Sequence, residues 1–279
     1  MSDTVKIDGI SLAYTETAPP AHLGTVLFVH GNSSGRASFY AQMESHELRK
    51  NFKLVSVDLP GHGESAWDPR AKGGPSIYTL SYFAKILAEF VRAKKLENLI
   101  LVGHSLGGHI SIGATKNIPN LKGLMIYQTP PLETLEDLAR GFLPVPAMGA
   151  LLTENPSDDD KQNLLDCLFA NPNPEFKRMV GRLYSLSDPK FRGNIAASFA
   201  PGIVLQEQTI LKNLKVPVAI LHGHEDKLIS GDYVRSMNVP TLWKNRVLGI
   251  PSSGHYAHLE NPKDFNLALL QFAMDALKN

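Results

Sequence analysis

Five short runs of β-branched and other apolar residues recur along the chain, each shorter than an ordinary core helix. They are TVLFVH (25–30), KLVSVD (53–58), NLILVGH (98–104), LKGLMIY (121–127) and VPVAILH (216–222). Runs that are apolar at nearly every position suit strands covered on both faces, as in a parallel sheet. NRVLGI (245–250) is expected to add a further strand, and the alternating VKIDGISLAYTE (5–16) to form an antiparallel hairpin at the sheet edge.

Helical patterns separate these runs. Apolar residues repeat at helical spacing between Leu80 and Val91, again after Ser105, and in the final stretch that begins at Pro262. Strands that alternate with helices predict an α/β fold with a doubly wound, mostly parallel sheet and right-handed crossovers. Ligands of such sheets bind beyond the carboxyl ends of the strands, so functional residues are expected there.

One interval interrupts the alternation after the sixth strand. From 132 to 212 there is no convincing buried strand, only proline-punctuated helical pieces rich in Leu, Phe and Met. We therefore expect a helical cap (132–212) on a core made of residues 1–131 and 213–279. Most apolar side chains of the cap should pack it onto the core, and a few should face a pocket beneath. Gly73-Gly74-Pro75 and PSDDD (156–160) are expected to be loops.

Composition narrows the class of protein. The 279 residues are 43% hydrophobic, enough for one substantial core with a modest appended subdomain. With 28 basic and 27 acidic residues and no long run of one sign, nothing favours nucleic acid or a membrane surface as a partner. The single cysteine, Cys167, excludes an internal disulfide, and neither a signal peptide nor a membrane-spanning run is recognisable. We expect a cytoplasmic monomer or homodimer whose partner is a small molecule.

The strongest chemical indication is LVGHSLGGHI (101–110), where a buried strand meets a helix. Glycines two residues either side of Ser105 permit a turn so tight that the serine takes strained dihedrals and projects its hydroxyl. The helix start also offers free N–H groups to a developing oxyanion. The alternative is that Ser105 is a simple helix N-cap, but its place at a strand end favours a nucleophile. We interpret His104 and His109 as packing and polar fill.

A nucleophilic serine needs a neutral imidazole within hydrogen-bond reach, itself oriented by a carboxylate. Two later strand ends supply candidates: Asp226 follows VPVAILH in a turn, and His255 lies in the loop before the C-terminal helix. Glu225 is the rival acid, but adjacent side chains of an extended segment diverge, so only one should reach His255. His258 is the rival base, and its position beside the helix favours a structural role.

The stretch LHGHED (221–226) raises a metal alternative, because metallohydrolases hold zinc with His-x-His-x-Asp. In those enzymes a histidine follows the aspartate, where this chain has Lys227, whose charge would repel the ion. His222 ends an apolar strand and is expected to face the interior. Loss of one ligand usually leaves no tight site. We therefore expect no metal and no cofactor, and we interpret the run as a strand end that delivers a catalytic acid.

The chain resembles the α/β-hydrolase fold family over nearly its whole length. The segments that carry the resemblance are VHGNSSG, DLPGHGES, GHSLGGH, HGHEDKL and SGHYAHLENP, in this order. The chain order serine, acid, histidine is also that of the family. The resemblance implies an oxyanion hole made by the backbone N–H groups of Asn32 and Leu106. It further implies architectural roles for the residues of the DLPGHGES turn, which are Asp58, Gly61, His62 and Gly63.

Within that fold, GLMIYQTPP (123–131) and DYVRSMNVPTLW (232–243) are similar to a subgroup of N-acyl-homoserine lactonases, which open the lactone ring of bacterial quorum-sensing signals without a metal. The resemblance implies that the cap holds an acyl chain while the triad meets the ring carbonyl. The order of Glu225 and Asp226 and the cap sequence depart from that subgroup. GLMIYQTPP is equally compatible with a plain sheet strand ended by prolines.

Several other functions remain open. A general carboxylesterase, thioesterase, carbon–carbon bond hydrolase or perhydrolase would use the same three residues. A ligand receptor built on this fold is an alternative of another class. Haloalkane dehalogenases and epoxide hydrolases are disfavoured, because they place aspartate where Ser105 stands.

Overall fold

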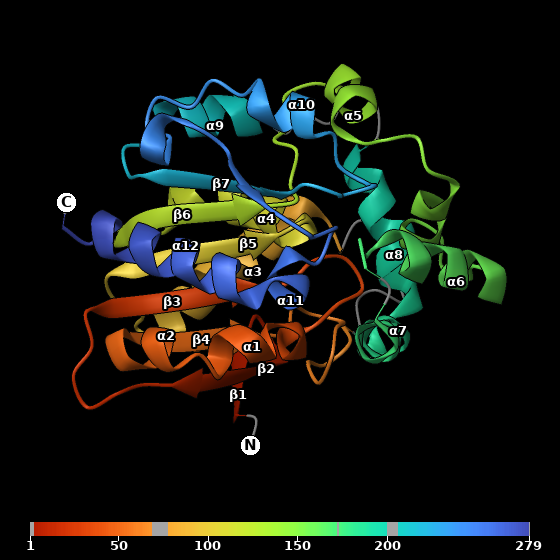
Figure 1. Ribbon diagram of the computed structural model, residues 1–279. Helices are drawn as coiled ribbons and strands as arrows, with labels where there is room; N and C mark the ends of the chain where they lie inside the picture. Colours follow the sequence, from red (N-terminus) through yellow and green to blue (C-terminus); the bar gives the residue numbers. More distant parts are fainter. Residues whose placement is uncertain (1–2, 69–77, 172, 200–205, 279) are drawn as a thin grey trace.

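A single twisted sheet runs through the centre of the computed structural model, which describes residues 3–68, 78–171, 173–199 and 206–278 (Figure 1). Within these residues the sheet has eight strands in the order β1-β2-β4-β3-β5-β6-β7-β8. The strands are β1 (Asp3–Ile7), β2 (Ile10–Thr17), β3 (Gly24–Val29), β4 (Phe52–Val57), β5 (Leu99–His104), β6 (Leu121–Tyr127), β7 (Val218–Gly223) and β8 (Leu248–Ile250).

The pairing confirms the predicted mostly parallel sheet. β1 pairs with β2, and β2 with β4, in antiparallel register, which places the expected hairpin at the sheet edge. The pairs from β4 through β3, β5, β6 and β7 to β8 are all parallel. The carboxyl ends of the parallel strands therefore lie along one edge of the sheet, where their loops can meet.

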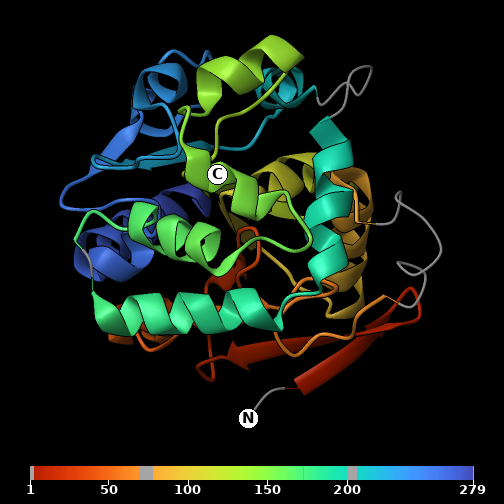
Figure 2. The ribbon, with the colours of Figure 1, turned by 90° about the vertical axis from the view of Figure 1, so that its right-hand side faces the viewer.

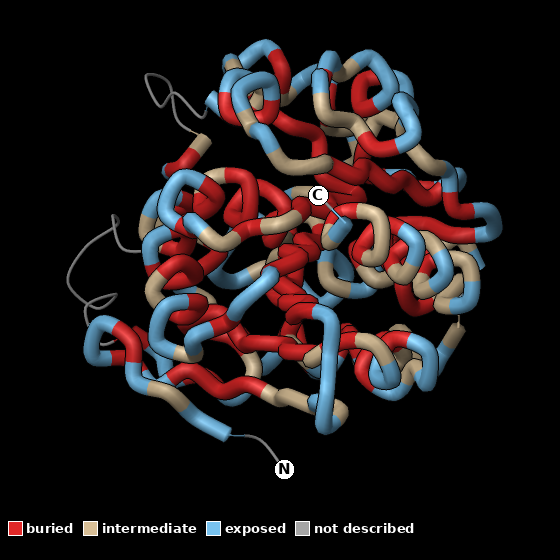
Figure 3. The backbone as a smooth tube through the Cα atoms, turned by 90° about the vertical axis from the view of Figure 1, so that its left-hand side faces the viewer, coloured by how far each residue is buried: buried red, intermediate tan, exposed pale blue. Residues whose placement is uncertain are grey.

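Helices cover both faces of the sheet, which explains why its central strands are apolar at every position. α3 (Leu80–Ala93) and α4 (Leu106–Ala114) pack on one face, and α1 (Tyr40–Met43), α2 (His46–Asn51) and α12 (Pro262–Ala276) on the other (Figure 1). The short elements outside the β6–β7 segment are η1 (Arg36–Phe39), η3 (Thr115–Asn117), α10 (Gly231–Arg235), η6 (Trp243–Asn245) and α11 (Ala257–Glu260). Figure 3 shows the buried backbone concentrated in the strands, with exposed residues on the outer loops and helix faces.

Strand β3 illustrates the two-sided burial. Leu27 and Val29 join the hydrophobic cluster under α3 and α4, whereas Val26 and Phe28 join the cluster under α12. All four are fully buried. At about 25 cal/mol per Å² of apolar surface, burial on both faces is a large stabilising contribution for so short a strand. None of the described helices is long and apolar enough to cross a bilayer.

The segment between β6 and β7 is helical, and part of it covers the carboxyl edge of the sheet. Its elements are α5 (Leu135–Gly141), η4 (Pro146–Leu151), α6 (Asp158–Cys167), α7 (Pro174–Leu186), α8 (Pro189–Ala196), η5 (Ala197–Phe199) and α9 (Glu207–Asn213). Figures 1 and 2 show α6, α7 and α8 beyond the strand ends rather than on a face of the sheet. α9 differs, because it packs against α4 beside the sheet.

One expectation for this segment was wrong. Most of PSDDD (156–160) is not a loop: Asp158 to Asp160 form the first turn of α6, and Ser157 is its N-cap. Ser157 Oγ accepts a hydrogen bond from the Asp160 amide, while the Asp160 carboxylate accepts one from the Ser157 amide, each at 3.1 Å. This reciprocal pair satisfies free amides of the first turn and lets a run of three aspartates begin a helix. Gly73-Gly74-Pro75 lies outside the described residues.

Polar contacts tie the helices beyond the strand ends to the core. The Asp188 amide donates to the Gly61 carbonyl at 2.8 Å, and its buried carboxylate accepts from Tyr78 Oη at 3.0 Å. Within the helical segment itself, Arg192 stacks over the Tyr184 ring and donates to the carbonyls of Thr153 and Glu154. The hydrogen bonds satisfy groups that would otherwise be buried without a partner.

The buried face of α12 provides a test of this packing. Phe272 is fully buried in the cluster under α12, whereas Leu267 on the same helix is 51% exposed. Phe272→Ala is expected to lower the free energy of unfolding by about 3–5 kcal/mol, and Leu267→Ala to change it by no more than about 0.5 kcal/mol. Urea denaturation followed by circular dichroism measures both. Equal effects of the two substitutions would contradict the assigned faces.

Candidate active site

Ser105 stands in a strained turn between β5 and α4. Its backbone dihedrals are φ 51° and ψ −120°, a conformation that costs a residue with a side chain on the order of 1–3 kcal/mol. Glycines make the turn possible: a Cβ on Gly103 would lie 2.5 Å from the Gly107 carbonyl oxygen, and one on Gly107 would overlap the Val29 carbonyl. The close approach of α4 to β3 and β5 therefore projects the Ser105 side chain beyond the strand end.

His255 and Asp226 form a buried pair at the same edge of the sheet. His255 Nδ1 lies 2.9 Å from Asp226 Oδ2. The other carboxylate oxygen, Oδ1, accepts hydrogen bonds from the amides of Leu228 and Ile229 at 2.8 and 3.3 Å. Because these amides fix the carboxylate, Nδ1 of a neutral His255 carries the proton and Nε2 keeps its lone pair.

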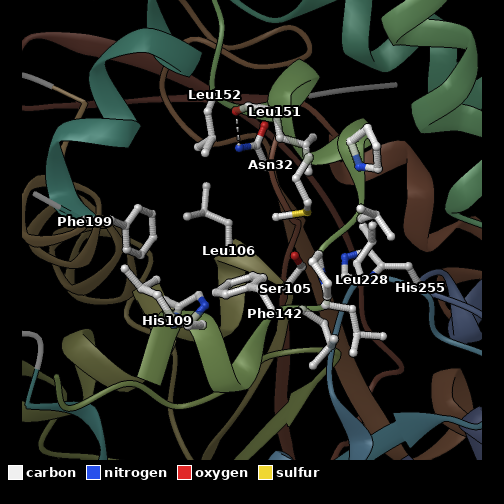
Figure 4. Close-up of a pocket in the computed structure, with 18 residues that line it drawn as sticks. Asn32, Ser105, Leu106, His109, Phe142, Leu151, Leu152, Phe199, Leu228 and His255 are labelled. Carbon is white, nitrogen blue, oxygen red and sulfur yellow. Dashed lines mark hydrogen bonds between the residues drawn. The ribbon is translucent and has the colours of Figure 1, made fainter. Parts of the chain in front are cut away.

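Ser105 and His255 line one pocket, whose volume is about 700 Å³ (Figure 4). Its polar lining side chains are those of Asn32, Ser105, His109 and His255. The other lining residues are Leu106, Leu138, Ala139, Phe142, Leu143, Pro144, Val145, Pro146, Met148, Leu151, Leu152, Phe199, Leu228 and Ile229. The size and the apolar wall suit a small ligand with an acyl chain.

Asn32 and Leu106, whose backbone N–H groups are the expected oxyanion donors, line the same pocket as Ser105. Leu106 is the first residue of α4, so its amide has no acceptor within the helix. The Asn32 side chain is engaged elsewhere: Nδ2 donates to the Leu151 carbonyl at 2.9 Å, and Oδ1 accepts from Ser33 Oγ at 2.8 Å. The backbone of Asn32 is therefore its candidate donor. A Cβ on the preceding Gly31 would lie 3.2 Å from Ser105 Cβ, so this loop passes close to the serine.

The rival residues have other partners. Glu225 accepts a hydrogen bond from the Ser253 amide at 2.8 Å, and its own amide donates to the Ser253 carbonyl at 2.9 Å, so its carboxylate is committed to the backbone. His258 is fully buried, with its ring 5.0 Å from the Phe39 ring and 6.0 Å from the Phe265 ring. Burial lowers the pKa of His258 to about 3, which keeps it neutral.

The remaining histidines near Ser105 differ from one another. His104 Nε2 contacts the His255 carbonyl at 2.8 Å while its ring stacks on Tyr127; burial lowers its pKa well below the ordinary value. It supports the loop of His255 from beneath. His109 instead lines the pocket and contacts Glu207, a residue that the sequence interpretation did not single out. Helical spacing could have indicated His109, because it lies one turn after Ser105 on α4.

The side chains of LHGHED (221–226) face different surroundings. His222 is buried, and its Nε2 lies 3.2 Å from the Ile229 carbonyl. The His224 ring lies against Gly249 of β8. Asp226 faces His255. Within the described part of the chain, no three His, Cys, Asp or Glu side chains are grouped so as to hold a metal ion.

The chain matches the model of the alpha/beta hydrolase family over residues 26–268 and belongs to that family. It is 24% identical over 290 residues to the bifunctional esterase/perhydrolase DCH of Acinetobacter calcoaceticus, covering 95% of this chain and 96% of that protein. It is 26% identical over 267 residues to the AB hydrolase superfamily protein YisY of Bacillus subtilis, covering 90% and 92%.

Solved structures agree with this membership. The N-acyl homoserine lactonase AidH, in complex with N-butanoyl homoserine, superposes with a TM-score of 0.89 at 26% identity, covering 99% of this chain and 97% of AidH. A thermophilic esterase from Thermogutta terrifontis gives a TM-score of 0.79 at 21% identity, covering 99% of both chains, and so shares the fold. Family membership, together with the arrangement of Ser105, His255 and Asp226, makes the chain an ester hydrolase.

Two adjacent acids provide a matched test of the site. Asp226→Asn is expected to lower kcat by about 10³- to 10⁴-fold, because an amide at this position favours the wrong tautomer of His255. Glu225→Gln keeps an oxygen for the Ser253 amide and is expected to change kcat less than about threefold. Release of p-nitrophenol from p-nitrophenyl butyrate measures both rates. If kcat falls more in Glu225→Gln than in Asp226→Asn, Glu225 rather than Asp226 is the acid that orients His255.

The low pKa of His258 makes stability depend on pH. The unfolded chain protonates this histidine below its ordinary pKa of 6.5, whereas the folded protein does not until about pH 3. Its contribution to stability is therefore complete above pH 6.5 and decreases as the pH falls toward 3. As the pH falls from 6 to 4, the unfolding free energy of His258→Phe should decrease less steeply than that of wild type. The difference between the two slopes should be roughly 1 kcal/mol per pH unit. Urea titrations at several pH values test this, and an unchanged slope would contradict it.

Proposed function

We propose that the chain is a serine hydrolase that opens N-acyl-homoserine lactones through an acyl-enzyme. The observation that carries the proposal is the apolar pocket of about 700 Å³ that reaches both Ser105 and His255. A pocket of this kind can hold an acyl chain while the lactone carbonyl lies at the serine. The likeness to AidH along almost the whole chain supports this choice of substrate. Residues 132–212 would form the cap that supplies most of the apolar wall.

The proposed reaction uses three side chains and two amides. His255 Nε2 removes the Ser105 proton as the hydroxyl oxygen attacks the lactone carbonyl carbon. Asp226 holds the Nδ1 proton and stabilises the imidazolium that forms. The Asn32 and Leu106 amides would donate to the oxyanion, an interaction worth about 3–4 kcal/mol per donor.

Attack of Ser105 gives a tetrahedral intermediate. Its collapse breaks the bond between the carbonyl carbon and the ring oxygen. The ring oxygen takes the proton from His255 and becomes the free hydroxyl of the opened homoserine, which stays attached to the acyl-enzyme. A water molecule then attacks the acyl carbon with His255 as base. Ser105 leaves with the proton, and the N-acyl-homoserine carboxylate is released.

A general carboxylesterase on the same triad is the second candidate. The bifunctional esterase/perhydrolase relative favours it, because that protein matches nearly the whole of this chain. The pocket wall is apolar along most of its surface, so it could also accept simple aliphatic acyl groups. The two candidates share every catalytic step and differ in which ester binds best.

The lactone assignment is tested by its product. N-butanoyl-, N-hexanoyl- and N-octanoyl-homoserine lactone are incubated with the protein, and ring opening is followed by mass spectrometry as the gain of one water. We expect kcat/KM for the best lactone to exceed that for p-nitrophenyl butyrate by at least about tenfold. Ser105→Ala should remove both activities, by about 10⁶-fold if the triad acts as a unit.

Two outcomes would contradict the proposal. Ring opening no faster than the uncatalysed reaction, with rapid p-nitrophenyl ester cleavage, would leave the carboxylesterase. Activity on either substrate that survives Ser105→Ala would remove the serine from the mechanism. The control for folding is that wild type and Ser105→Ala give the same circular dichroism spectrum.

A further inference from the structure

A second buried contact between an imidazole and a carboxylate lies at the pocket. His109 Nδ1 is 2.9 Å from each carboxylate oxygen of Glu207, and both side chains are more than nine-tenths buried. His109 belongs to α4 and Glu207 begins α9, so the pair exists only because the fold packs these helices together. The proposed reaction at Ser105 does not use it.

The pair is placed close to the reacting atoms. His109 follows Ser105 by four residues, which is one helical turn or about 6 Å along α4. The ring lines the pocket, near the rings of Phe142 and Phe199 at centroid distances of 6.4 and 6.2 Å. Figure 4 shows Ser105 between His109 on one side and His255 on the other.

Glu207 fixes the direction of the His109 ring. Glu207 Oε2 accepts a hydrogen bond from the Leu132 amide at 2.7 Å, and the Glu207 amide donates to the Leu132 carbonyl at 2.9 Å. A carboxylate has no hydrogen to donate, so Nδ1 of His109 donates to it. In the neutral imidazole this leaves the lone pair on Nε2. The ring thus offers a hydrogen-bond acceptor within a wall that is otherwise almost entirely apolar.

We propose that His109 determines substrate specificity by accepting a hydrogen bond from an N–H group that the substrate carries next to its scissile carbonyl. The dimensions agree: the amide nitrogen of an α-acylamino ester lies two bonds, about 2.5 Å, from the carbonyl carbon. A hydrogen bond of about 2.9 Å then reaches a ring one helical turn from the nucleophile. The substrate class is α-acylamino esters and lactones. This inference rests on the proposed ester cleavage by Ser105 and extends it to the group beside the carbonyl.

The test compares two acyclic esters that differ in one atom group. p-Nitrophenyl N-butanoylglycinate carries the N–H, and p-nitrophenyl butanoyloxyacetate has an oxygen in its place. Release of p-nitrophenol reports cleavage of the activated ester alone in both. Wild type is expected to prefer the amide by about tenfold in kcat/KM, since the oxygen analogue has no hydrogen to donate to Nε2 of His109.

His109→Phe should reduce the preference to about one, because its ring fills the same space without an acceptor. His46→Phe is the matched control: His46 also contacts a glutamate, Glu47, at 3.0 Å, but it lies exposed on α2. This variant should keep the wild-type ratio. The ratio is insensitive to the fraction of active protein, which cancels between substrates.

The outcomes separate this inference from the lactone assignment. If wild type shows a ratio of kcat/KM, amide over oxygen analogue, of one or below, the role of His109 is overturned even if His109→Phe does not fold. The role is also overturned if a folded His109→Phe keeps the wild-type ratio. A tenfold ratio that His109→Phe abolishes supports the inference even if no homoserine lactone is opened, in which case only the lactone assignment fails. No p-nitrophenol release from either ester would overturn this inference, while the lactone assignment would still be decided by the mass-spectrometric assay of ring opening.

Discussion

The close approach of α4 to the ends of β3 and β5 is the constraint on which the site depends. Only glycine at 103 and 107 allows this approach, because a side chain at either position would meet backbone atoms of a neighbouring element. The resulting turn holds Ser105 at φ 51° and places the first amide of α4 beside it. The strands beneath are buried on both faces, and this close-packed surrounding can hold the strained turn in place.

The other candidate groups of the site come from loops that follow different strands. Asp226 follows β7, His255 follows β8 and Asn32 follows β3, so the parallel sheet is what aligns them. Hydrogen bonds then set each orientation: the amides of Leu228 and Ile229 hold the Asp226 carboxylate. The chemistry thus depends less on any single loop than on the shared direction of the strands.

The sequence predicted the sheet well, because the central strands are apolar at every position and the hairpin alternates. Asp226 was predicted as the acid from its place in the turn after the strand VPVAILH, and the divergence of adjacent side chains meant that only one of Glu225 and Asp226 should reach His255. The structure places Asp226 against His255. The sequence did not predict contacts between distant residues or features that depend on two residues acting together. The contact of His109 with Glu207 joins residues 98 positions apart. The helix start at Ser157 needed both halves of a capping pair to be recognised. Composition alone made that aspartate run resemble a loop.

Asn32 belongs to two parts of the molecule at once. Its backbone borders the pocket after β3, while its side chain donates to the Leu151 carbonyl in η4, among the helices that follow β6. If η4 moves outward, either this partly buried hydrogen bond breaks or the loop of residues 30–32 moves with η4. Ligand entry from that side would therefore be coupled, through one short side chain, to the position of the Asn32 backbone N–H, which is the proposed oxyanion donor.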